Sequence, residues 1–177
     1  PFLLTLSRLR IINFDTFRII ICKLKISIMN YPKKVVIGDI TVRDGFQHEE
    51  IFVPTEAKLW VLEEMILSGI KHLEVTNFGN PRGMPQFKDA DELFKKIRSS
   101  KKVAGLLDDV SLTAVTIREK AVERAIQAKK EGWGPDRILM MVSTSESHQK
   151  QNSGLTLAEY WKMAEEWIPK AQDAGLT

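Results

Sequence analysis

The 177-residue sequence contains one cysteine, Cys22, so an internal disulfide framework is excluded. No CxxC pair is present, and the three histidines do not have the spacing of a local zinc motif. Neither GxGxxG nor GxxxxGK[ST] occurs, so both common glycine-rich phosphate loops are missing. These absences argue against a disulfide-bonded secreted domain, a zinc finger and an ordinary nucleotide-binding sheet, and the lone cysteine favours a reducing, cytoplasmic compartment.

The charge balance also argues against two classes of partner. The formal net charge is +3 and the lysines and arginines alternate with acids along most of the chain, so no basic stripe points to nucleic acid. Lysines and arginines interrupt every apolar run before the roughly 20 residues that a bilayer requires, so no membrane partner is expected. A content of 44% hydrophobic and 28% charged residues is typical of one soluble globular domain.

Residues 1–28 differ from the rest because they are rich in Ile, Leu, Phe, Lys and Arg, with Asp15 as their one acid. Three interpretations remain open: a membrane span, which the basic residues disfavour, a mitochondrial transit peptide, and translated upstream sequence before a true start at Met29. The chain opens on Pro1, which favours the third. We therefore expect residues 1–28 to be an extension outside the core, and residues 29–177 to form the domain.

Four times along the domain, a short apolar run is followed by an amphipathic helical stretch. The predicted strands cover residues 35–42, 70–76, 103–107 and 137–142. The predicted helices end near Gly69, Arg98, Gly132 and Gly175. Thr55 is a predicted helix N-cap, and Thr156 with Glu159 has the spacing of a capping box.

Alternating strands and helices predict an α/β fold with a parallel sheet. The sheet could be open or closed, and the missing glycine-rich turn favours closure. We therefore predict a TIM (β/α)8 barrel of which about four βα units are present, since the complete fold takes about 250 residues. Residues 176–177 lie where a fifth strand would begin, so the chain is expected to stop before the barrel closes.

Parallel folds place their chemistry at the carboxyl ends of the strands. Arg43 and Asp44 follow the first predicted strand, where a guanidinium and a carboxylate could stabilise an oxyanion and bind a metal, or form a solvated turn. Glu74 lies in an apolar strand, where a charge is costly unless it has a partner. We expect it either to meet Arg43 and Asp44 at one edge of the sheet or to pair with a lysine of the helical layer. The polar stretch 143–148 could bind substrate or be an ordinary loop.

Several segments together resemble one enzyme family. TVRDGFQ (41–47) and VPTE (53–56) are similar to the opening of the family that includes 3-hydroxy-3-methylglutaryl-CoA lyase, isopropylmalate and homocitrate synthases, and biotin-dependent carboxyltransferase domains. EVTNF (74–78) and MPQF (84–87) resemble the lyase branch. The segment 145–152 is similar to the stretch after the fourth strand of the same relatives.

The resemblance implies a role for each residue at the first two strand ends. Asp44 is expected to bind a divalent cation, Mg²⁺ or Mn²⁺, and Arg43 to stabilise the enolate of the departing acyl-CoA. Glu74 is expected to support the metal-bound substrate and Gln47 to shape the site. The implied activity is a metal-dependent carbon–carbon lyase that cleaves a 3-hydroxyacyl-CoA by retro-Claisen or retro-aldol chemistry.

The remaining expectations also follow from the resemblance. Ser145, His148 and Asn152 are expected to contact the acyl-CoA substrate, and the full-length protein is expected to be a homo-oligomer. The relatives' metal-binding histidines and catalytic cysteine lie beyond the position of Thr177, so this chain alone is expected to be inactive. The alternatives are a Claisen-type synthase and a non-catalytic truncated product.

Two departures leave the acyl group open: Asn77 stands where the lyases have Ser, and the third unit, from residue 108 onward, is longer and lacks their Asn-containing turn. Gly45 stands where carboxyltransferases tend to have Ala, which disfavours that branch.

Overall fold

The computed structural model describes residues 31–177, of which residues 37–177 form one compact unit. The expected extension, residues 1–28, lies outside the described residues and stays a prediction. None of the helices in residues 31–177 has the length and apolar character needed to cross a membrane.

The sheet has four parallel strands whose order in space follows their order in the sequence. They are β1 (Gly38–Asp39), β2 (His72–Asn77), β3 (Ser111–Val115) and β4 (Arg137–Leu139). The last residue continues this order, because the Thr177 amide donates to the Asp136 carbonyl at 3.1 Å and its carbonyl accepts from the Ile138 amide at 3.0 Å. The chain thus begins to pair along β4 where a fifth strand was predicted.

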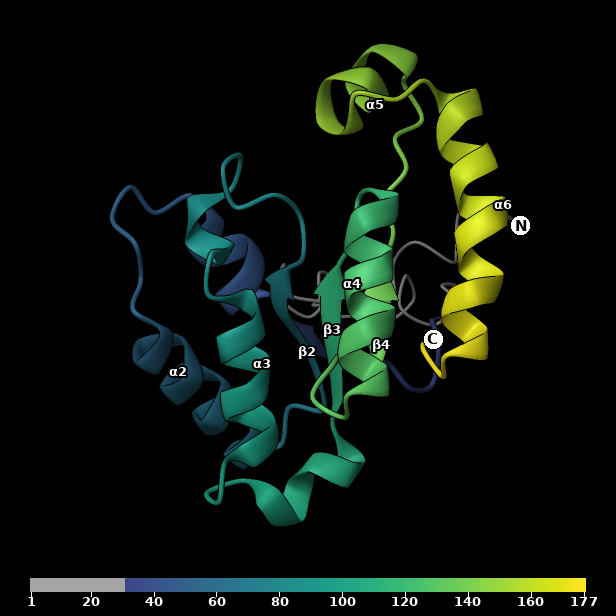
Figure 1. The fold of residues 1–177 in the computed structure, drawn as a ribbon. Helices are drawn as coiled ribbons and strands as arrows, with labels where there is room; N and C mark the ends of the chain where they lie inside the picture. The colour runs from purple at the N-terminus through teal and green to yellow at the C-terminus, as the bar shows by residue number, and fades with distance from the viewer. Residues whose placement is uncertain (1–30) are drawn as a thin grey trace, which may run out of the picture. The chain divides into compact units, whose positions relative to one another are not determined.

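Helices connect and flank the strands. They are α2 (Thr55–Leu67), α3 (Ala90–Ser99), α4 (Glu119–Lys130), α5 (Glu146–Ser153) and α6 (Leu157–Asp173), with short turns η1 (Thr41–Gly45), η2 (Pro85–Phe87) and η3 (Ala104–Asp109). In Figure 1, α2 lies beside α3 and α4 beside α6, while α5 stands beyond the carboxyl ends of β2 and β3. Gly69 and Gly175 take φ values of 94° and 79° after α2 and α6, which explains glycine at these predicted helix ends.

The core lies between the sheet and the helices. Leu73 and Val75 of β2 are fully buried and belong to the same apolar cluster as α3 residues such as Phe94. Because side chains alternate along a strand, Glu74 lies on the opposite face of β2. Glu74 therefore does not point into the helical layer, which decides between its two predicted environments.

The first strand is much shorter than predicted. Val35, Val36 and Ile37 are exposed and outside any strand, and β1 consists of two residues. The Asp39 carboxylate accepts hydrogen bonds from the Thr41 amide (2.8 Å) and hydroxyl (3.0 Å). Such local side-chain bonds compete with the strand ladder, and the chain turns at once into the π-helix η1.

The third strand was predicted in the wrong place. The apolar run 103–107 falls largely in the 3-10 helix η3, and the strand is β3, where buried Leu112 and Ala114 alternate with the less buried Ser111 and Thr113. A short apolar run does not distinguish strand from helix, whereas alternation does. The following helix starts at Glu119. The fourth strand also ends early, at Leu139 instead of residue 142.

One predicted cap is confirmed and one is wrong. Thr156 accepts from the Glu159 amide while the Glu159 carboxylate accepts from the Thr156 amide, the two bonds of a capping box. The N-cap of α2 is Pro54 and not Thr55. The Thr55 hydroxyl instead donates to Asp89 Oδ2 at 2.8 Å.

Candidate active site

An ion pair joins η1, which follows β1, to Glu74 in β2. Arg43 lies in η1, and its side chain is 8% exposed. Its Nε donates to Glu74 Oε2 at 2.6 Å, and its Nη2 lies 2.5 Å from the same oxygen. The parallel pairing of Asp39 with Leu73 brings the two segments together. The guanidinium is therefore fixed by a residue 31 positions away in the sequence.

Asp44 completes this group. Its Oδ1 lies 2.5 Å from Arg43 Nη1, and its side chain is 44% exposed. Arg43, Asp44 and Glu74 thus converge at the carboxyl end of the sheet as predicted. One guanidinium sits between two carboxylates, and Asp44 is the member that faces solvent most. Such a group can polarise a carbonyl and offer one carboxylate oxygen to a cation.

The described residues do not form a complete metal site. Magnesium takes about six oxygen ligands, and waters usually supply several of them. Asp44 offers a half-exposed carboxylate, but the carboxylate of Glu74 is engaged by Arg43. Within residues 31–177 no three His, Cys, Asp or Glu side chains are grouped so that they could hold a metal ion. The donor set of residues 31–177 therefore does not fit a metal ion by itself.

Gln47 lies one turn after η1 and is half-buried. Its side chain makes no hydrogen bond to any residue that the structure describes. The expected role of Gln47 in shaping the site stays a prediction.

The three residues expected to contact substrate form a separate cluster along α5. Ser145 is the N-cap and accepts from the His148 amide at 3.5 Å. Ser143 Oγ lies 2.8 Å from His148 Nδ1, and Asn152 Nδ2 lies 3.5 Å from His148 Nε2. Among the described residues no hydrogen bond joins this cluster to Arg43. The structure thus brings the predicted residues together as two groups.

Comparison with known proteins decides the family. The HMGL-like family model matches residues 34–177, which is most of the chain. The chain belongs to the HMGL-like family.

The relatives of this HMGL-like chain are lyases in name. The hydroxymethylglutaryl-CoA lyase YngG of Bacillus subtilis is 28% identical over 149 residues, which are 84% of this chain and 46% of the relative. The mitochondrial hydroxymethylglutaryl-CoA lyase of Arabidopsis thaliana is 30% identical over 128 residues, 72% of this chain and 25% of the relative. The chain therefore spans less than half the length of these relatives.

The fold is similar to that of a solved lyase. The crystal structure of the Bacillus subtilis HMG-CoA lyase matches with a TM-score of 0.72 at 28% identity, over 84% of this chain and 46% of that one. The α/β architecture with four sequential parallel strands is that of a TIM barrel, and the predicted fold class is confirmed.

Sequence reasoning missed a buried polar network next to this site. Lys58 of α2 is 1% exposed, and its ammonium donates to Asp89 Oδ1 at 2.8 Å and Oδ2 at 3.1 Å, and to the Gln86 carbonyl. A signal was available, because Lys58 lies four and eight residues before Leu62 and Ile66 on the buried face of α2. A lysine in an apolar stripe requires a buried anion, and Asp89 supplies it.

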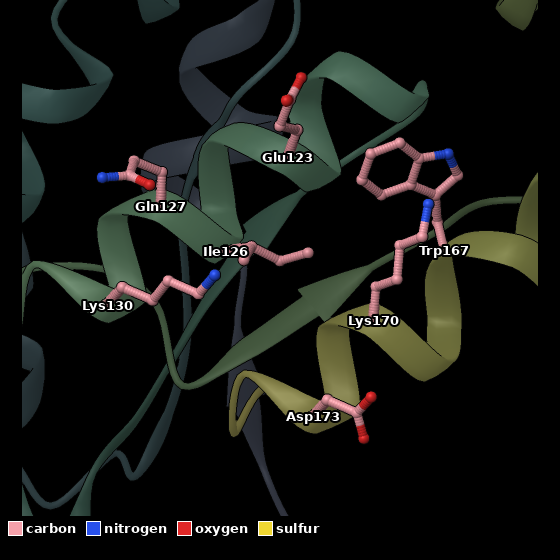
Figure 2. A pocket seen from close by; sticks show the side chains of 7 residues that line it. All are labelled: Glu123, Ile126, Gln127, Lys130, Trp167, Lys170 and Asp173. Carbon is pink, nitrogen blue, oxygen red and sulfur yellow. The ribbon is translucent and has the colours of Figure 1, made fainter.

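A groove in the helical layer is distinct from the candidate site. It lies between α4 and α6 and holds about 410 Å³ (Figure 2). It is lined by Glu123, Ile126, Gln127, Lys130, Trp167, Lys170 and Asp173. Lysines and acids both line it, and the Lys170 ammonium stands 4.1 Å from the centre of the Trp167 ring. None of the predicted site residues belongs to this groove.

Proposed function

We propose that this chain supplies Arg43, Asp44 and Glu74 to a carbon–carbon lyase that cleaves a 3-hydroxyacyl-CoA by retro-Claisen or retro-aldol chemistry. The observation that carries the proposal is the buried Arg43 guanidinium, held by Glu74 at the carboxyl end of an HMGL-like sheet. The names of the relatives support the reaction class.

The proposed chemistry needs a cation where Arg43 lies. When a general base takes the proton of the 3-hydroxyl, the C2–C3 bond breaks and C3 becomes a carbonyl. The electron pair of that bond forms the thioester enolate, which then takes up a proton at C2. A fixed N–H donor aimed at the enolate oxygen stabilises the negative charge that develops there. Glu74 is proposed to orient Arg43, because it binds Nε and Nη2 and leaves less rotational freedom to the guanidinium.

Asp44 is proposed as the contribution of this chain to an Mg²⁺ or Mn²⁺ site. A carboxylate oxygen is a suitable ligand for either ion, and the Asp44 side chain is 44% exposed. The other ligands of such a site are not grouped with Asp44 among residues 31–177. We expect the 177-residue protein alone to bind Mg²⁺ or Mn²⁺ weakly in isothermal titration calorimetry, and Asp44→Asn to abolish what binding there is.

The remaining assignments are proposals of the same kind. Ser145, His148 and Asn152 are proposed to contact the acyl-CoA. They follow the carboxyl end of β4, just as Arg43 follows the carboxyl end of β1. Gln47 is proposed to line the same site. We further propose a homo-oligomeric full-length protein in the cytoplasm, a compartment that the single cysteine in the sequence favours.

The test is a chimera in which residues 34–177 replace the matching segment of the Bacillus subtilis lyase. We expect the folded chimera to release acetoacetate from 3-hydroxy-3-methylglutaryl-CoA with added Mg²⁺ or Mn²⁺. The 177-residue chain alone is the control and should release none.

Other outcomes of this assay would replace the proposal. Condensation of acetyl-CoA with a 2-oxoacid, without cleavage, would assign the synthase branch instead. A folded chimera with neither activity would mean that the chain is a non-catalytic product.

A further inference from the structure

We propose that Gln86 is a positioning residue that fixes the path of residues 49–53 and thereby holds Arg43 against Glu74. The inference deepens the proposed function, since it concerns the same site, and rests on it for its catalytic meaning. Its structural content is independent of turnover, because it predicts the behaviour of one hydrogen bond, from Arg43 Nε to Glu74 Oε2.

The Gln86 side chain binds the segment 49–53 as a neighbouring strand would. Its Nε2 donates to the carbonyls of Glu49 and Ile51, both at 2.7 Å, and its Oε1 accepts from the Val53 amide at 3.0 Å. The side-chain amide of Gln86 thus binds three alternate residues, and Gln86 is 4% exposed. Because the Gln86 side chain is buried, opening these bonds would leave its amide unpaired, so the clamp is costly to open.

The buried Lys58–Asp89 pair fixes the backbone of Gln86. The Lys58 ammonium donates to the Gln86 carbonyl as well as to Asp89, and the Thr55 hydroxyl donates to Asp89 Oδ2 at 2.8 Å. Little water reaches this pair, so its geometry resists change. The start of α2 and the segment before α3 are thereby joined at Gln86.

Buried Val42 anchors one side of Arg43, and the clamp fixes the segment that follows Arg43. The strand before it, β1, has two residues, and the segment after it is exposed, with Ile51 82% exposed. Glu49, the first clamped residue, lies six positions after Arg43. Phe52 adds a second tie, because its ring centre lies 4.4 Å from the Lys58 ammonium. The short β1 upstream and the clamp downstream therefore fix the backbone that carries Arg43.

The competing explanation is that the network stabilises the fold without any effect on Arg43. The two explanations differ in one observable, the exchange of the Arg43 Nε–H with solvent. Arg98 Nε, which donates to the Gly134 carbonyl at 3.1 Å, and Arg124 Nε, which donates to Asp91 at 2.9 Å, report opening elsewhere in the molecule. Both are internal controls in the same spectrum.

The experiment measures arginine Nε–H exchange by NMR in the 177-residue protein, well below its unfolding temperature. Gln86→Met keeps the volume of the side chain but removes its hydrogen bonds, and Gln86→Ala removes both. We expect each variant to accelerate exchange of the Arg43 Nε–H about tenfold or more, with Arg98 and Arg124 unchanged. Ile97→Val, in the core of α3, should leave Arg43 unchanged relative to the two controls.

Unchanged exchange at Arg43 in both Gln86 variants would overturn the proposal, whether or not the Val53 amide loses protection. If one variant does not fold, the other decides. In an active chimera, Gln86→Met should lower kcat more than it raises KM. An inactive chimera with accelerated Arg43 exchange would refute the proposed function while leaving the positioning role of Gln86 intact, so the two failures are distinguishable.

Discussion

The carboxyl ends of β1 and β2 and the loop after β4 are held in different ways. Arg43 meets Glu74, and Lys58 meets Asp89, each across 31 residues of sequence. In the loop after β4, Ser143 meets His148, a partner five residues away. The first region is assembled by the fold, whereas the second is assembled by its own helix.

The two regions also differ in burial. The side chains of Arg43 and Lys58 are almost fully buried, while His148 contacts its partners on the exposed surface. Removing one partner of a buried charge lowers the free energy of unfolding strongly, whereas removing an exposed contact lowers it little. The contrast predicts a graded response to substitution, from the first region to the second.

The largest loss is expected from Lys58→Met, which leaves the Asp89 carboxylate buried without its cation. Breaking a buried pair in this way costs about 3–5 kcal/mol of unfolding free energy. Urea unfolding monitored by circular dichroism measures it. The double variant Lys58→Met/Asp89→Leu should recover at least half of the loss, because no buried charge remains unpaired. If Lys58→Met lowers the free energy of unfolding no more than an exposed substitution does, Lys58 and Asp89 do not form a buried pair.

Glu74→Ala should have the next largest effect. It removes two contacts to Arg43 but leaves Asp44 as a partner, so we expect a loss of about 2 kcal/mol in the same urea experiment. Glu165→Ala, at an exposed position of α6, is the control and should change stability by less than about 0.5 kcal/mol. Equal losses for the two variants would show that Arg43 and Glu74 do not form a buried pair in solution.

A local cap near the second region should matter less and depend on pH. Thr156→Ala should cost about 1 kcal/mol of unfolding free energy, because it removes the N-cap of α6.

Hydrogen bonds from the backbone and then the side chain of Thr156 lower the pKa of Glu159 below its usual 4.5. The ionised form is therefore favoured in the folded state, and its contribution is present above pH 4.5 and lost as the pH falls below it. Thermal melts of wild type and Glu159→Gln should differ at pH 7 and converge as the pH falls through the lowered pKa of Glu159; a difference that does not change with pH would contradict this linkage.

The smallest effect on stability is expected for His148→Ala. Its side chain makes exposed contacts with Ser143 and Asn152, so the change should stay within about 0.5 kcal/mol by thermal or urea unfolding. A loss comparable to that of Glu74→Ala would mean that the loop after β4 is coupled to the core, and the contrast between the two regions would fail.

The same contrast between local and long-range contacts separates the residues that the sequence predicts from those that it does not. The capping box was found because both partners lie three residues apart, and Glu74 was found because a charge in an apolar strand needs a partner. Lys58 could have been found from its place in the apolar stripe of α2. Gln86 could not, because its partners are backbone atoms 33 to 37 residues away, and no local pattern specifies them.

The errors in strand placement have a related cause. The apolar run 103–107 has the composition of a strand, but that composition also suits a 3-10 helix, which is the conformation it takes for most of its length. The shortness of β1 depends on hydrogen bonds from Thr41 to Asp39, which apolar patterning does not register. Fold class was therefore predictable from the repeating pattern, whereas element boundaries depended on individual polar contacts.

The most direct test of the central claim is the effect of Arg43→Gln on acetoacetate release by the chimera with the Bacillus subtilis lyase. If Arg43 stabilises the developing enolate, kcat should fall about 100-fold or more while KM changes less, and Glu165→Ala, at an exposed position of α6, should retain most of the turnover in the same chimera. Arg43→Gln protein that folds and keeps kcat near that of the unsubstituted chimera would contradict the assignment of this site.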